Sequence, residues 1–240
     1  MKLLWSIWAI DRNDPRTEEL LNRLLSWRRL VNVIRKRSSR MKATPRPENI
    51  PKRDVYLDCG EYLLRTVNSD DASERWANWM SDPKNLRLVN SASKAMTPQD
   101  IVTYINQFDQ RSHLLIGIFE KQGGSQIGFF RLDIDHRLSR CLMFLLIGEQ
   151  KYRHWSVTDD LRGPFQDYIF DTLGLNTILA TVLVSNRAMV RYMLKSGWNL
   201  DKTVERNVKS KAADAMLDLS LLSLSREAWQ TWKRKNPLLR

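Results

Sequence analysis

The spacing of apolar residues predicts most of the elements between residues 61 and 235. Segments 114–120 and 126–135 are rich in apolar and β-branched residues and are separated by a Gly-Gly turn, so they predict a hairpin. The apolar run 140–148 predicts a third, central strand. Further strands are expected at 61–67, 177–184, 198–207 and 212–222.

Polar caps that precede a helical spacing of apolar residues predict two helices after the first strand. Thr97 and Asp100 form such a start for residues 101–108, and Ser69 begins a cap for residues 72–80. Two consecutive helices are therefore expected between the first strand and the hairpin.

Residues 149–162 are polar and are expected to form a turn. The next helix is therefore expected to run through Phe165 and to stop at Gly174, with shorter helices at 188–196 and 226–235. The resulting order of strands and helices predicts an α/β (α+β) domain built on a mixed, mainly antiparallel sheet.

The first part of the chain has a different pattern. Residues 14–37 predict a basic amphipathic helix, with one apolar seam formed by Leu20, Leu24, Trp27, Val31 and Ile34. Residues 38–53 contain three Pro and predict a linker. We therefore expect a basic helical extension with its linker over 1–53 and the main domain over 54–240.

The positive charge of the chain is concentrated in that extension. The formal net charge is +12, and residues 1–53 hold 14 Lys or Arg against 5 Asp or Glu, whereas residues 54–240 hold 25 against 22. The apolar seam suits docking on the main domain or on a second copy in a homodimer. The basic face, over residues 16–53, suits attraction to nucleic acid or to an anionic membrane surface. The pattern leaves these alternatives open.

Composition limits the class of protein. With 42% hydrophobic and 28% charged residues, the chain resembles ordinary soluble globular proteins. Cys59 and Cys141 lack CxxC spacing and are expected to be buried thiols of a reducing compartment, which favours the cytoplasm. No apolar run is long enough to cross a membrane.

Several common sites are absent from the sequence. It has no GxxxxGK[ST], HExxH or GxSxG motif. The three histidines, His113, His136 and His154, are not spaced as metal ligands, so no metal is expected.

Three segments resemble one family. They are WMSDPKNLRLVN at 79–90, LIGEQKYRHWSVTDDL at 146–161 and LGLNTILATVLVSNRAMVRYMLKSGW at 173–198. Together with the element order they resemble the GNAT acetyltransferase superfamily, specifically its Rim-type branch, which includes ribosomal-protein N-acetyltransferases. The resemblance implies a GNAT-like fold and an acyl-CoA-dependent N-acyltransferase, with acetyl passing from acetyl-CoA directly to a primary amine in a ternary complex.

The resemblance also implies where the cofactor binds. A tight turn that leads into a helix start offers unpaired N–H groups to a pyrophosphate, and free strand-edge groups can bind the pantetheine arm. The chain departs from the family at Ser156 and Thr158, where family members have Gly and Gly or Ala, and two acids, Asp159 and Asp160, follow. The implied cofactor-binding residues are Leu146, Ile147, Gly148, Arg153, His154, Trp155, Ser156, Val157, Thr158 and Asn186.

Acetyl transfer to an amine requires a group that takes the amine proton. Glu149, which directly follows the central strand, is the first choice for this base, and Asp133, Asp135 and His136 are further candidates near strand ends. Tyr192 is the candidate proton donor, although the position that holds the general-acid Tyr in many family members is Met193 here.

The acceptor stays open at this level. A protein N-terminus, an amino sugar, a small amine and an aminoacyl-tRNA all carry a suitable amine. The alternative function is a non-catalytic binding or scaffold protein of GNAT fold with a degenerate CoA site, which would contact partners through the basic N-terminal helix.

Overall fold

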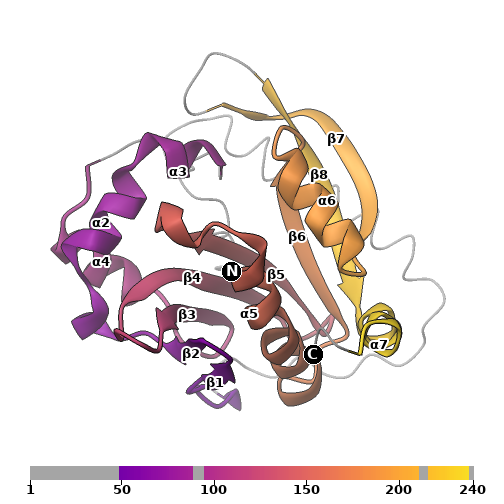
Figure 1. Cartoon of the computed structure of the whole chain (residues 1–240), viewed down its shortest axis with the longest axis horizontal. Coiled ribbons are helices and arrows are strands. Elements are labelled where there is room, and N and C mark those ends of the chain that lie inside the picture. Colours follow the sequence, from indigo (N-terminus) through magenta and orange to yellow (C-terminus); the bar gives the residue numbers. More distant parts are fainter. Residues whose placement is uncertain (1–48, 89–94, 211–215, 238–240) are drawn as a thin grey trace. The chain divides into compact units, whose positions relative to one another are not determined.

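The computed structural model describes residues 49–88, 95–210 and 216–237. Within these residues, eight strands form one sheet in the order β1-β2-β3-β4-β5-β6-β8-β7 (Figure 1). Every neighbouring pair is antiparallel except β5 and β6. The strands are β1 (Tyr56–Cys59), β2 (Tyr62–Thr66), β3 (His113–Glu120), β4 (Gln126–Asp135), β5 (Arg140–Ile147), β6 (Thr177–Leu183), β7 (Asn199–Lys209) and β8 (Met216–Ser225).

Helices lie on both faces of this sheet. They are α2 (Glu74–Ser81), α3 (Pro83–Leu88), α4 (Pro98–Ile105), α5 (Trp155–Asp167), α6 (Arg187–Lys195) and α7 (Arg226–Lys235). Adjacent side chains of β4 lie on opposite faces of the sheet. Phe129 packs on Trp76 of α2, whereas Phe130 stacks on Phe165 of α5. The α5 face also buries Met193 of α6, and the α2 face buries Ile101 of α4. The predicted mixed, mainly antiparallel α/β fold is confirmed.

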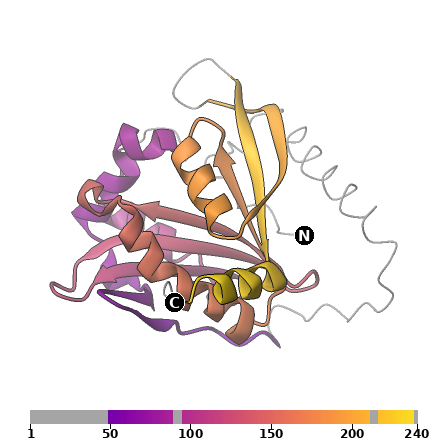
Figure 2. The ribbon, with the colours of Figure 1, turned by 45° about the vertical axis from the view of Figure 1, so that its right-hand side comes forward.

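The sheet opens between its two central strands. β5 and β6 pair only over Arg140–Leu142 and Thr177–Leu179. Beyond this point β6 continues beside β8 as far as Leu183, while residues 143–147 of β5 pair with β4 alone. Figure 2 shows the two halves of the sheet meeting at one end and spreading apart at the other. We call the last β5–β6 pair, Leu142 with Leu179, the fork.

Local signals placed several elements correctly. Thr97 caps α4, since its hydroxyl accepts from the Asp100 N–H at 3.2 Å while the Asp100 carboxylate accepts from the Thr97 N–H at 2.8 Å. The β3–β4 hairpin and α7 also have the expected positions. Cys59 and Cys141 are buried and unpaired, as predicted.

The predicted turn over residues 149–162 is wrong in its second half. The residues up to Tyr152 form a short 3-10 turn, but α5 already begins at Trp155. Only Val157, Leu161 and Phe165, one residue in four, bury apolar side chains on its inner face, so the apolar spacing was too sparse to predict a helix.

Helix α5 also continues past Pro164, although proline normally interrupts a helix. Pro164 lies inside α5, and the helix then widens into one π turn, Tyr168–Thr172, whose first three residues are buried. Burial of these large side chains offsets the hydrogen bond that Pro164 cannot donate.

Two elements were not predicted, and one segment lies outside the described residues. β1 pairs with β2 as an edge hairpin that turns at Gly60, with φ +66°, and α3 follows α2 after one residue. The expected N-terminal helix and most of the linker precede the described residues. Packing reaches back beyond the expected boundary at residue 54, because Ile50 is buried. In the described part of the chain, no helix is long and apolar enough to span a membrane.

Gly128 of β4 provides a test of the packing at the open end of the sheet. A Cβ at this position would lie 2.2 Å from the carbonyl oxygen of Leu146, which belongs to the neighbouring backbone. We expect Gly128→Ala to lower the free energy of unfolding by about 1–3 kcal/mol, measured by urea denaturation. Gly123→Ala is the control, because a Cβ there has only contacts of 3.8 Å, and equal losses in the two variants would contradict this account.

Candidate active site

The open end of β5 is held by close backbone contacts. The N–H groups of Gly148 and Glu149 both donate to the carbonyl of Ile127, at 2.9 and 3.3 Å. Gly148 lies directly against the indole of Trp79, because an added Cβ would lie 2.0 Å from that ring. The end of β5 is therefore fixed between β4 and α2 without a contribution from β6.

Arg153 braces the same strand end from the following turn. Its Nε donates to the Ile147 carbonyl at 2.9 Å and its Nη2 to the Gly148 carbonyl at 2.7 Å, and Nη2 also bonds Asn85 of α3. Asn85 in turn donates to the Trp79 carbonyl at 3.1 Å. Burial lowers the pKa of Arg153. The Arg153 guanidinium thus binds backbone carbonyls, and sequence reasoning missed both Asn85 and Trp79 as its surroundings.

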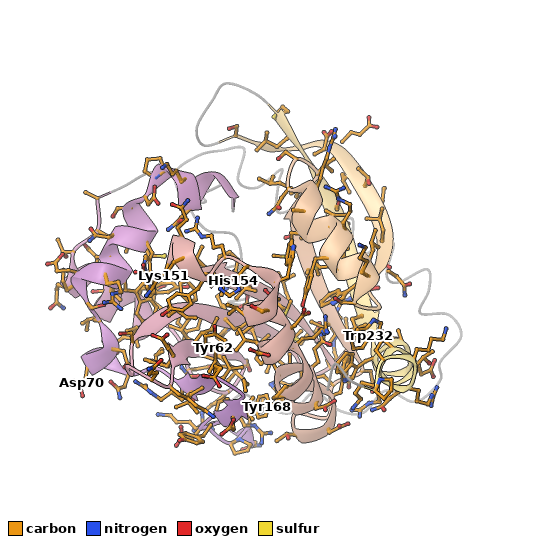
Figure 3. The ribbon with its side chains drawn as sticks, in the orientation of Figure 1. Tyr62, Asp70, Lys151, His154, Tyr168 and Trp232 are labelled. Carbon is orange, nitrogen blue, oxygen red and sulfur yellow. The ribbon has the colours of Figure 1, made fainter. Side chains whose placement is uncertain are left out.

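The first turn of α5 lies just after this brace (Figure 3). His154 is the N-cap, yet its side chain makes no bond to the N–H groups of the first turn and instead bonds the Ser156 hydroxyl through Nδ1. Ser156 is exposed and Val157 is fully buried. The start of α5 therefore presents N–H groups without a side-chain cap and the positive end of the helix dipole.

Tyr192 joins α6 to α5. Its ring stacks on the half-exposed Trp155 at 4.6 Å, with 5° between the planes. Its hydroxyl donates to Asp159 at 2.8 Å and accepts from Arg162 at 3.1 Å. Burial raises the pKa of Tyr192 above its usual range. The next residue, Met193, is buried in the core.

The charges that follow the first turn of α5 are partly compensated. Asp159 forms an ion pair with the buried Arg162 at 2.8 Å, and Arg162 also donates to Ser196 of α6 at 3.0 Å. Burial, with Asp159 and Glu61 nearby, raises the pKa of Asp160. The ion pair with Arg162 thus offsets part of the negative charge beside this helix start.

Asn186 lies beyond the open end of β6. It is the N-cap of α6, where its side-chain oxygen accepts from the Met189 N–H at 3.3 Å, and its own N–H donates to the Leu183 carbonyl at 2.8 Å. The side chain therefore has a helix-capping role in the folded chain.

The structure separates the four candidate bases. Glu149 lies at the open end, where the Trp79 indole N–H donates to its carboxylate at 3.0 Å and Arg75 lies 3.7 Å away. Asp135, the last residue of β4, and His136, in the β4–β5 connection, lie at the opposite end of β5. Neither of these two is therefore near the open end.

Asp133 lies level with the fork and forms a charged cluster. In the sheet it is opposite Leu142 of β5 on one side and His113 of β3 on the other. Its Oδ1 lies 2.9 Å from His113 Nδ1 and its Oδ2 lies 3.4 Å from the Nε of Arg131. The hydrogen bond to Asp133 raises the pKa of His113. Sequence reasoning missed His113, because only the hairpin register brings it to Asp133.

Comparison with protein families identifies the chain. Residues 62–199 match the family model described as an acetyltransferase (GNAT) domain. The chain belongs to the GNAT acetyltransferase family. Members of this family use acetyl-CoA to acetylate amines. No curated protein sequence matches the chain significantly.

Solved GNAT structures share this fold at low sequence identity. An acetyltransferase from Bacillus anthracis aligns with a TM-score of 0.62 at 14% identity, over 72% of this chain and 99% of that one. Ribosomal-protein-S5-alanine acetyltransferase from Vibrio fischeri aligns with a TM-score of 0.63 at 13% identity, over 73% of this chain and 99% of that one. Spermidine N-acetyltransferase from Vibrio cholerae, in complex with CoA and spermine, aligns with a TM-score of 0.64 at 14% identity, over 71% of this chain and 98% of that one.

Two further observations delimit the site. Among the described residues, no group of three or more His, Cys, Asp or Glu is arranged to hold a metal ion. A cleft of about 460 Å³ lies between α5 and α7, lined by Pro164, Asp167, Lys233 and others. It lies toward the far end of α5 from His154, so it is separate from the open end of the sheet.

The His113–Asp133 pair predicts a pH-dependent contribution to stability. The folded-state pKa of His113 lies above the ordinary 6.5. The pair with Asp133 therefore stabilises the fold fully below pH 6.5, and this contribution is lost as the pH rises through the raised pKa. We expect His113→Gln to lower the free energy of unfolding more at about pH 5.5 than at about pH 9, measured by urea denaturation. Lys121→Gln, which removes the exposed pair with Asp58, is the control, and a pH-independent loss in His113→Gln would contradict this assignment.

Proposed function

We propose that this GNAT protein transfers an acetyl group from acetyl-CoA directly to a primary amine within a ternary complex, as Rim-type members do. The observation that supports this proposal best is the divergence of β5 from β6 next to the uncapped start of α5. The divergence of the strands leaves a free edge on β5, and the uncapped start of α5 carries the positive end of the helix dipole, which favours anions.

The residues at the open end suit acetyl-CoA. The N–H groups of residues 156–158 and the Ser156 and Thr158 hydroxyls would bind the pyrophosphate. Backbone groups of Leu146, Ile147 and Gly148 would bind the pantetheine arm, while Arg153 holds this strand end in place. The bound thioester supplies an activated acetyl carbon. The pairing of Asp159 with Arg162 removes part of the repulsion that two acids would otherwise exert on a phosphate.

Trp155 and Asn186 would line the two sides of the same opening. The Trp155 indole, half exposed at the start of α5, offers an aromatic face to the nucleotide. The side-chain amide of Asn186 lies at the start of α6, and its oxygen is used as a cap, so its NH₂ group is the part that would bind the pantetheine.

The acceptor amine would approach from the α2 face, opposite α5. On that face Glu149 is held by Trp79 and is a candidate to accept the amine proton. Tyr192 is less suited to donate a proton to the departing thiolate, because its hydroxyl already donates to Asp159 and its pKa is raised. The acceptor classes that fit are a protein N-terminus, an amino sugar or a small amine. The proposals of a homodimer and of nucleic-acid or membrane contact through residues 16–53 concern residues that lie mainly outside the described ones.

Calorimetric titration with acetyl-CoA and with CoA tests the cofactor site. We expect saturable micromolar binding, weakened more than tenfold by Ser156→Glu, because a carboxylate at the helix start repels the pyrophosphate. Ser69→Glu is the matched control on a distant exposed serine.

Asn186→Asp refines the same experiment. Asp keeps the oxygen that caps α6 but removes the NH₂ donor, so it should weaken acetyl-CoA binding several-fold without loss of folding stability. Absence of binding by the folded wild-type chain would overturn the proposed function and favour a scaffold protein of GNAT fold.

A further inference from the structure

We propose that His113 is the general base of this transferase and that Asp133 is its positioning residue, together forming a dyad on the α2 face at the level of the fork. This inference rests on the proposed function. The candidate bases that the sequence suggests near strand ends do not include His113, and only the β3–β4 register brings the two side chains together.

The direction of the cofactor arm favours a reacting end near the fork. A pyrophosphate at the start of α5 lies at the open end of β5, and an arm that follows the free edge of residues 143–147 runs from there toward Leu142. Five strand residues span roughly 16 Å. Glu149 lies at the start of this path, whereas Asp133 is opposite Leu142 at its end. The reacting carbon is therefore expected closer to the dyad than to Glu149.

The two ring nitrogens of His113 have different environments. Nδ1 is bound to the Asp133 carboxylate at 2.9 Å, which fixes the ring and favours the tautomer with hydrogen on Nδ1. Among the described residues, Nε2 has no recorded hydrogen-bond partner, and the His113 side chain is 35% exposed. Nε2 is thus free to accept a proton. Because β3 lies two strand spacings, about 10 Å, from β5, the proton of an amine near β5 would reach Nε2 through bridging water on the α2 face.

The surroundings of the dyad suit a base that works near neutral pH. Asp133 is 14% exposed, and its Oδ2 lies 3.4 Å from the Nε of the buried Arg131. Asp109 accepts the His113 backbone N–H at 2.9 Å, and the buried Cys141 thiol also lies within electrostatic reach of Asp133. The combined effect, with the Asp133 bond largest, raises the pKa of His113.

The step that follows is balanced in protons and electrons. His113 Nε2 takes one proton from the acceptor amine while the amine nitrogen bonds the acetyl carbon and the carbon–sulfur bond breaks. The electron pair of that bond leaves with sulfur, and the thiolate takes a proton from water. The imidazolium then returns its proton to solvent, so neither an oxidant nor a metal is required.

The pH dependence of kcat/KM distinguishes this role from a structural one. Full-length protein is assayed for thiol release from acetyl-CoA with spermidine, glucosamine and an alanine-initiated peptide. For any acceptor that reacts, we expect a rising limb with an apparent pKa above 6.5, the ordinary value for His113. A limb that arises from the acceptor amine would instead move with the amine's own pKa.

Two variants then test the dyad, and a third serves as the control. We expect His113→Gln to lower kcat about 100-fold and to abolish this limb, with acetyl-CoA binding by calorimetry unchanged. Asp133→Asn should lower kcat at least about tenfold and move the His113 imidazole resonance, followed by NMR, to a lower pKa. Asp201→Asn, on the exposed part of β7, is the control.

The outcomes separate the two proposals. If acetyl-CoA does not bind, or if no acceptor reacts, the proposed function fails and the dyad with it. If transfer occurs and His113→Gln keeps both the turnover and the pH limb, the dyad is overturned while the proposed function stands. A loss of turnover that follows only Glu149→Gln would assign the base to the open end of the sheet.

Discussion

The arrangement of this domain depends on how the free end of β5 is held in place without β6. A strand that loses one neighbour leaves its backbone groups unpaired along that edge, and burial of such groups is costly. Here several contacts hold the opposite edge and the end of β5. The Ile127 carbonyl accepts two N–H groups, Trp79 lies against Gly148, and Arg153 donates to two carbonyls. The edge that faces β6 can therefore stay open.

This bracing also links the two faces of the sheet. Arg153 precedes α5, whereas Asn85 and Trp79 belong to α3 and α2 on the other face. A shift of the α2–α3 segment would therefore be transmitted to the start of α5 through the Arg153 guanidinium. On the α5 face, Arg162 has a similar effect, because it connects Asp159 with Tyr192 and Ser196 of α6.

The sequence predicted the features that depend on neighbouring residues and missed those that depend on register. The cap at Thr97, the β3–β4 hairpin and α7 follow from local signals, as does the resemblance of the motif around Gly148 to the family. The apolar spacing missed the start of α5, because one apolar residue in four is a weak signal, although the family resemblance implied a helix start there. The pairs Trp79 with Glu149 and His113 with Asp133 join residues 70 and 20 positions apart, so no local pattern could have found them.

The interruption of α5 at Pro164 divides this helix into parts of unequal local stability. Pro164 has no N–H to donate to the Asp160 carbonyl, and the residues after it are anchored in the core by Phe165, Ile169 and Phe170. The first two turns, which carry the uncapped helix start, are held mainly by Val157 and Leu161 and by the Arg162 contacts. We therefore expect opening of these turns to cost less free energy than global unfolding, and their amides to exchange with solvent sooner than those of the π turn. The two ends of α5 would thereby differ in how readily they unfold, with the core-anchored end the more persistent.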